Sequence, residues 1–89
     1  KKLNFYLGYS AFKIGYYEIA LASFERVSMI DPSDIRNQLE MARTYFMLKM
    51  FENSERLFRS VLTNPKLPKN VRKTVERYII KMTKSKPKS

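Results

Sequence analysis

Apolar residues recur along this chain with the three- to four-residue spacing of amphipathic helices, and the intervals between them predict five helices. We place these helices at about residues 3–14, 17–30, 34–48, 51–62 and 69–83. The apolar face of the last helix consists of Val71, Val75, Tyr78, Ile79 and Met82. Ile80 points away from that face. The pattern therefore predicts an all-α protein.

The pattern also repeats along the chain at a constant interval, so that position 7 corresponds to position 41 and position 8 to position 42. The apolar or small residues Leu7, Gly8, Ala11, Tyr17, Ala20, Phe24 and Val27 return as Met41, Ala42, Tyr45, Phe51, Ser54, Phe58 and Val61. A fixed period of this length indicates one helix–turn–helix unit that is copied along the chain. We therefore expect stacked antiparallel helix pairs, with repeats at 1–34 and 35–67 and a capping helix at 68–83.

The small residues and the glycines have structural explanations within this arrangement. Gly8 and Ala42 are expected where the two helices of a pair approach closely, with Ala20 as the small residue on the partner helix. Gly15 suits a left-handed turn between the helices. Its counterpart is Lys49, so the second turn is expected to be more strained or to differ in geometry.

The prolines predict where the helices end. Pro32 cannot continue a helix, and Ser33 or Asp34 can cap the next one. Pro65 arrives one residue earlier in the second copy, which predicts a shortened helix and a reset register. Pro68 suits the first turn of the last helix.

The order of these features resembles the tetratricopeptide repeat (TPR). The residues that carry the resemblance in the first copy are Leu7, Gly8, Gly15, Tyr16, Tyr17, Ala20, Phe24, Asp31 and Pro32. The resemblance implies a short right-handed TPR solenoid of two repeats and a C-terminal capping helix. It also implies a concave groove, lined by the first helix of each repeat, that binds another protein or a peptide.

The resemblance assigns ten positions to this groove as exposed residues. They are Lys2, Phe5, Tyr9, Phe12 and Lys13 in the first repeat, and Arg36, Leu39, Arg43, Phe46 and Met47 in the second. Such a groove suits a segment with apolar anchors and some acidic character. Alternatively, the aromatic residues pack against another repeat. We expect the chain to be a piece of a longer protein that can associate with itself through exposed repeat faces.

Chaperone-binding TPR proteins hold a C-terminal carboxylate with a clamp of Lys, Asn and Arg side chains. Three of the five clamp positions are occupied here by Phe5, Tyr9 and Glu40, and only Lys69 and Lys73 offer basic matches. We therefore do not expect this clamp to form.

A narrower resemblance concerns the C-terminal half. The run of residues 39–46 and the element Leu67-Pro68-Lys69-Asn70-Val71-Arg72 are similar to the periplasmic TPR segment of outer-membrane proteins such as the surface lipoprotein assembly modifiers. That likeness implies that the segment engages client proteins or assembly factors. The absence of cysteine is compatible with the cytoplasm and with the periplasm, so localisation stays open.

The net charge of +10 is concentrated near the C-terminus. Residues 1–65 contain nine basic and seven acidic residues, whereas residues 66–89 contain nine basic residues and one acidic residue. A second candidate surface, for anionic lipid or nucleic acid, consists of Lys69, Lys73, Arg77, Lys81 and Lys84. The alternative is a solvated helix face followed by a disordered basic tail at 84–89. Nucleic acid is not favoured, because no nucleic-acid-binding motif accompanies the charge.

Catalysis is not expected. The chain has no His and no Cys, its two glycines form no phosphate-binding loop, and its carboxylates are scattered. Glu52 and Glu55 share a helix face but are expected to pair with Arg56 and Arg59. We predict no catalytic residue, no metal site and no cofactor.

Overall fold

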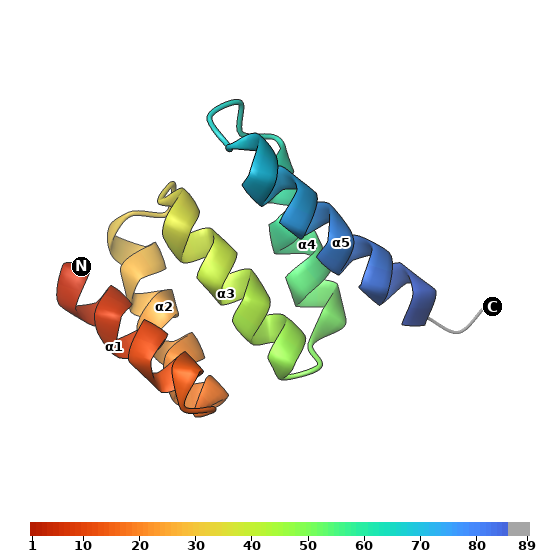
Figure 1. Cartoon of the computed structure of the whole chain (residues 1–89). Helices are drawn as coiled ribbons and strands as arrows, with labels where there is room; N and C mark the ends of the chain where they lie inside the picture. The colour runs from red at the N-terminus through yellow and green to blue at the C-terminus, as the bar shows by residue number, and fades with distance from the viewer. Residues whose placement is uncertain (86–89) are drawn as a thin grey trace.

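The computed structural model describes residues 1–85 and contains, within them, five α-helices joined by short connections (Figure 1). They are α1 (Lys2–Lys13), α2 (Tyr17–Ile30), α3 (Ile35–Met47), α4 (Phe51–Leu62) and α5 (Lys69–Ser85). The expected bounds of α2 and α4 are confirmed, and the others differ by one or two residues. Lys84 belongs to α5 and not to the predicted tail, and residues 86–89 of that tail lie outside the described part.

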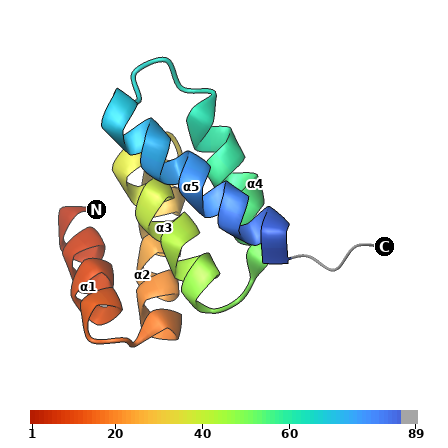
Figure 2. The same ribbon diagram turned by 45° about the vertical axis from the view of Figure 1, so that its right-hand side comes forward.

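The helices pack in chain order as adjacent antiparallel pairs. α1 lies against α2, α2 against α3, α3 against α4, and α5 packs on α4 (Figure 2). α1 and α5 therefore lie at opposite ends of a compact stack (Figure 1). Within residues 1–85 no helix combines the length and the apolar character needed to cross a bilayer.

The turns inside the two pairs have the same geometry. The N–H of Gly15 donates to the carbonyl of Phe12, and the N–H of Lys49 donates to the carbonyl of Phe46, both at 3.0 Å. Gly15 has a φ of 87° and Lys49 a φ of 62°, so both lie in the left-handed region. The predicted left-handed turn at Gly15 is confirmed. Lys49 adopts the same conformation, which costs a residue with a Cβ about 1–2 kcal/mol.

Two apolar clusters form the core. One lies between α1 and α2 and contains Phe5, Ala11, Ala20, Phe24 and Val27, with Phe12 and Met41 packed against it. The other joins α3, α4 and α5 and contains Ala42, Phe58, Val61, Leu67, Val75, Ile79 and Met82. Val75, Ile79 and Met82 of the predicted apolar face of α5 are buried, Val71 and Tyr78 are half-buried against the same cluster, and Ile80 is exposed as expected.

Polar side chains connect neighbouring helices inside this core. The amide of Asn37 on α3 donates to the carbonyl of Phe24 on α2 at 2.9 Å. The hydroxyl of Ser54 on α4 donates to the carbonyl of Ala42 on α3 at 2.8 Å. Asp34 caps α3 by accepting from the backbone N–H of Asn37 at 3.3 Å. These bonds fix how α3 sits between α2 and α4.

The corner between α4 and α5 differs from the corner between α2 and α3. α4 has 12 residues where α2 has 14, so the predicted shortening is confirmed. The predicted register reset is wrong, because α5 begins at Lys69, one full repeat step after the start of α3 at Ile35. The longer connection absorbs the difference: Leu67 fills the core, and the guanidinium of Arg72 donates to the carbonyl of Leu62 at 2.9 Å. Pro68 lies just before the first turn of α5.

Replacing Gly8 with Ala should destabilise the protein despite the higher helix propensity of alanine. A Cβ on Gly8 would lie 2.7 Å from Cε1 of Phe24, a fully buried ring. We expect Gly8→Ala to lower the free energy of unfolding by about 1–3 kcal/mol in urea denaturation. Ser10→Ala, at an exposed site on the same helix, is the control and should change it by no more than about 0.5 kcal/mol. Equal stability of the two variants would contradict the close packing at Gly8.

Replacing Lys49 with Gly should stabilise the protein, because glycine adopts the left-handed conformation without a Cβ clash. We expect Lys49→Gly to raise the free energy of unfolding by about 0.5–1 kcal/mol. The reciprocal change Gly15→Ala should lower it by about 1 kcal/mol. Thermal denaturation of both variants checks the pair, and a destabilised Lys49→Gly would show that this turn is not strained.

Candidate functional site

Phe5 is buried, so the prediction that it is an exposed groove residue is wrong, although its ring still lines the floor of the groove described below. Its side chain is only 7% exposed, and its ring packs on Phe24 with a centroid separation of 5.8 Å. Leu39 and Phe46 are half-buried for a related reason: both pack against the α3–α4–α5 core, and Phe46 contacts the ring of Tyr78 at 5.0 Å. These positions on α1 and α3 face a neighbouring helix and form part of the core.

The other predicted groove residues remain accessible to different degrees. Phe12 and Arg43 are half-buried, and the rest are exposed: Lys2, Tyr9, Lys13, Arg36 and Met47. The accessible set is therefore mainly basic and aromatic. Whether it binds a polypeptide stays a prediction.

Three adjoining cavities lie along α1, α3 and α5. The first, of about 350 Å³, is lined by Lys1, Lys2, Phe5, Asp34 and Arg36. The second, also about 350 Å³, is lined by Phe5, Tyr6, Tyr9, Arg36 and Glu40. The third, of about 400 Å³, is lined by Leu39, Glu40, Arg43, Phe58, Asn70, Val71, Thr74, Val75 and Tyr78. Because neighbouring cavities share residues, we treat them together as one groove.

Sequence reasoning missed the contribution of α5 to this groove. Asn70 and Thr74 of α5 line the third cavity. They lie one repeat step after Arg36 and Glu40, so continuing the same period along the chain identifies both. The expectation of a register reset at Pro65 concealed this correspondence.

Cationic side chains lie over aromatic rings along the groove. The guanidinium carbon of Arg36 is 4.5 Å from the centroid of Phe5, and that of Arg43 is 5.0 Å from the centroid of Phe12. The ammonium of Lys13 lies 5.4 Å from the ring centroid of Tyr9. Cation–π contacts of this kind hold the basic groups in place, and in Arg36 and Lys13 they leave the hydrogen-bond donors available.

An ion pair whose opposite charges compensate each other lies at the centre of the groove. Nη1 of Arg43 donates to the carboxylate of Glu40 at 2.8 Å. Burial alone would lower the pKa of Arg43, but its hydrogen bond to Tyr78 and the charge of Glu40 outweigh burial and raise that pKa. Arg43 and Glu40 therefore compensate each other and provide a fixed polar centre.

The N-terminal end of the groove contains both paired and unpaired cations. The ammonium of Lys1 lies 2.6 Å from a carboxylate oxygen of Asp31 and 3.2 Å from one of Asp34. The hydrogen bond to Asp31 raises the pKa of Lys1 and lowers the pKa of Asp31. By contrast, Lys2 and Arg36 have no carboxylate partner among residues 1–85. The groove thus has uncompensated positive charge where α1 and α3 meet.

The second predicted surface lies on α5. All five of its cations are exposed: Lys69, Lys73, Arg77, Lys81 and Lys84. On α4, Nε of Arg59 lies 2.9 Å from the carboxylate of Glu55, which confirms one of the ion pairs expected there.

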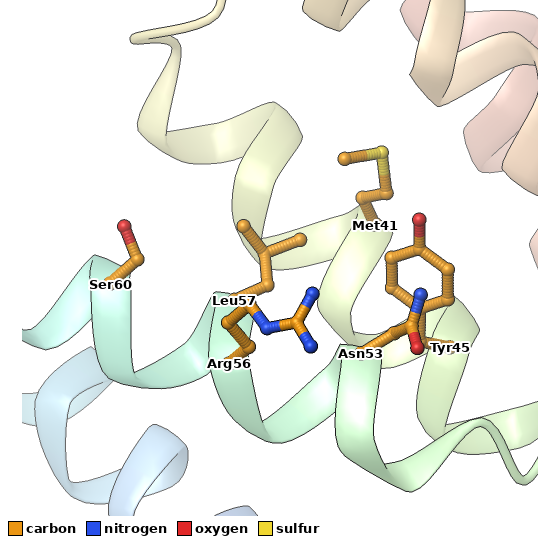
Figure 3. Close-up of a pocket in the computed structure, with 6 residues that line it drawn as sticks. All are labelled: Met41, Tyr45, Asn53, Arg56, Leu57 and Ser60. Atoms are coloured by element: carbon orange, nitrogen blue, oxygen red, sulfur yellow. The ribbon is translucent and has the colours of Figure 1, made fainter.

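A fourth cavity, of about 280 Å³, lies between α3 and α4 (Figure 3). Met41 and Tyr45 of α3 and Leu57 of α4 supply its apolar lining, and Arg56 of α4 lies beside them. It shares no lining residue with the groove. A ligand in this cavity and a ligand in the groove could therefore be bound at the same time.

Comparison with protein-family models, curated proteins and solved structures finds no match to this chain. In the described part of the chain, no three His, Cys, Asp or Glu side chains are grouped so that they could hold a metal ion. A functional interpretation therefore depends on the groove and on the surface charges of this chain.

Phe5 and Tyr9 are one helical turn apart and should respond very differently to truncation. Phe5→Ala removes a buried ring and should lower the free energy of unfolding by about 3–5 kcal/mol. Tyr9→Ala removes a ring that is 38% exposed and should lower it by about 1 kcal/mol. Urea denaturation followed by circular dichroism measures both. Similar losses in the two variants would mean that Phe5 does not belong to the core.

Proposed function

We propose that this chain is a non-catalytic protein-interaction module that binds a polypeptide segment along the groove formed by α1, α3 and α5. One observation carries the proposal: three adjoining cavities join accessible aromatic rings to cations that lack carboxylate partners. Such a surface can bury apolar side chains of a ligand and pair with its acidic groups. No bond is made or broken in this function.

We further infer that the helices form two TPR-type repeats and a capping helix in a right-handed solenoid. The shared geometry of the turns at Gly15 and Lys49 supports this inference. The close approach at Gly8 and the burial of the apolar face of α5 also support it. The same groove would suit a periplasmic segment that engages client proteins or assembly factors.

The groove favours a ligand with acidic residues next to an aromatic or aliphatic anchor. Lys2 and Arg36 supply unpaired positive charge at one end, and Tyr9 supplies an accessible ring next to them. The carboxylate of Glu40 already forms an ion pair with Arg43, so it should repel the acidic groups of a ligand only weakly. An acidic ligand segment is therefore compatible with this surface.

A second candidate function is attachment to an anionic surface through α5. The exposed cations of α5, including Lys73 and Arg77, support it. The two functions differ in salt dependence, since binding dominated by phosphate contacts weakens by orders of magnitude between about 50 and 200 mM salt. Burial of apolar anchors in the groove should be much less sensitive.

Selection from a random peptide display library tests the groove. We expect the intact chain to enrich peptides that contain Asp or Glu beside an aromatic or aliphatic residue. A double variant, Tyr9→Ala with Arg36→Gln, should bind the selected peptides at least about tenfold more weakly, because it loses both a ring and a cation. Phe5 is not a suitable target, since its truncation should affect folding.

A matched variant, Lys73→Gln with Arg77→Gln, serves as the control. It should retain peptide binding and lose binding to vesicles that contain phosphatidylserine. A failure to enrich any peptide, or equal enrichment on the Tyr9→Ala/Arg36→Gln variant, would contradict the groove. Vesicle binding that disappears at about 200 mM salt without any peptide binding would favour the α5 surface.

A further inference from the structure

The side of α1 that points away from α2 carries a stripe of apolar side chains. Leu3 is 71% exposed, Leu7 52% and Ile14 68%, and Ser10 completes the stripe with spacings of four, three and four residues. Positions with this spacing lie along one side of a helix. Exposed aliphatic side chains grouped in this way are typical of a docking surface. We call these four residues the α1 stripe.

The positions of the α1 stripe recur one repeat step later, along α3 and at its C-terminal end. They are occupied there by Asn37, Met41, Thr44 and Leu48. α2 covers this side of α3: Asn37 and Thr44 are buried, and the amide of Asn37 donates to the carbonyl of Phe24 at 2.9 Å. The second stripe therefore receives the helix that precedes it.

A third occurrence lies on α5. The corresponding residues are Val71, Val75, Tyr78 and Met82. α4 covers them: Val75 and Met82 are buried, and the ring of Tyr78 stacks on Phe58 at 4.9 Å. Two of the three stripes thus hold a helix. The α1 stripe occupies the same position in its helix pair as the stripes on α3 and α5, but no helix covers it in the described part of the chain. A helix is therefore the occupant that fits its shape.

The charges around the α1 stripe indicate what kind of helix would bind there. The charged residues of α1 are Lys2 and Lys13, both basic, whereas the segment 17–34 that covers α3 contains four acidic residues and one basic residue. A second copy that placed α1 against α1, or α1 against the basic outer side of α5, would bring like charges together. The chain itself has a net charge of +10. An acidic helix from a different protein is therefore favoured over these two contacts between copies.

We propose that the α1 stripe is a second docking surface, which shares none of its four residues with the groove and binds an acidic amphipathic helix of a partner protein. The helix packs on α1 as α2 packs on α3, with apolar residues at positions i, i+4 and i+7 against Leu3, Leu7 and Ile14. Its acidic residues lie next to Lys13 and next to Lys2, which also lines the N-terminal end of the groove.

A synthetic peptide with the sequence of residues 17–34, carrying Arg26→Glu, is a suitable probe, because it presents the face that covers α3 and is strongly acidic. We would titrate it into the ¹⁵N-labelled full chain and follow the amide shifts. The shifts should cluster on the stripe residues of α1. Leu7→Glu should weaken binding at least about tenfold, since it replaces a central apolar contact with a charge of the same sign as the peptide.

Ile80→Glu is the matched control, because Ile80 is an exposed aliphatic residue at the opposite end of the stack; it should leave the affinity within about twofold. A peptide with Gln at all three glutamate positions should bind several-fold more weakly at low salt. The proposal is overturned if no shifts appear at about 1 mM peptide, or if they cluster on Tyr9 and Arg36. It is also overturned if Leu7→Glu has no effect, or if light scattering shows a dimer that this substitution dissociates.

Discussion

The packing of Phe24 is the constraint on which the arrangement of the first three helices depends. Its ring lies where a Cβ on Gly8 would be, and it also packs on Phe5. Its carbonyl accepts the hydrogen bond from Asn37 of α3. One residue therefore sets the distance between α1 and α2 and the position of α3. A larger residue at position 8 would separate α1 from α2. It would also move the ring of Phe5, over which the guanidinium of Arg36 lies.

The groove follows from this arrangement. Because α2 and α4 lie behind α1, α3 and α5, the odd-numbered helices share one side. Rings on that side that pack against a neighbouring helix, as Phe5 packs on Phe24 and Phe46 on Tyr78, belong to the core and not to the open surface. Burial of Phe5 places a fixed ring beneath the guanidinium of Arg36. The aromatic residue thus positions the cation and is not itself the contact surface. Binding at this site would depend on a rigid floor that positions the polar groups above it.

Compensation of charge distinguishes the groove from its surroundings. Lys1 is paired with Asp31 and Asp34, and Arg43 with Glu40, so these groups contribute little net field. Lys2 and Arg36 lie between these pairs without carboxylate partners in the described residues. The five cations of the predicted α5 surface, Lys69, Lys73, Arg77, Lys81 and Lys84, are exposed to solvent, whereas Arg72 is half-buried. Similar basic residues therefore belong to three environments: ion pairs, cations positioned over rings, and a solvated helix surface.

The helices, their repeat period, the left-handed turn at Gly15 and the small residue at Gly8 could be predicted from the sequence, because each depends on local spacing or backbone conformation. The sequence also indicated the basic and aromatic character of the groove. The burial of Phe5, the unchanged register of α5 after Pro65 and the place of Asn70 and Thr74 in the groove were visible only once the helices were packed together. Exposure of a residue depends on which helix packs beside it, and that is a property of several segments together. The amphipathic pattern of α1 alone could not distinguish its covered side from its open one.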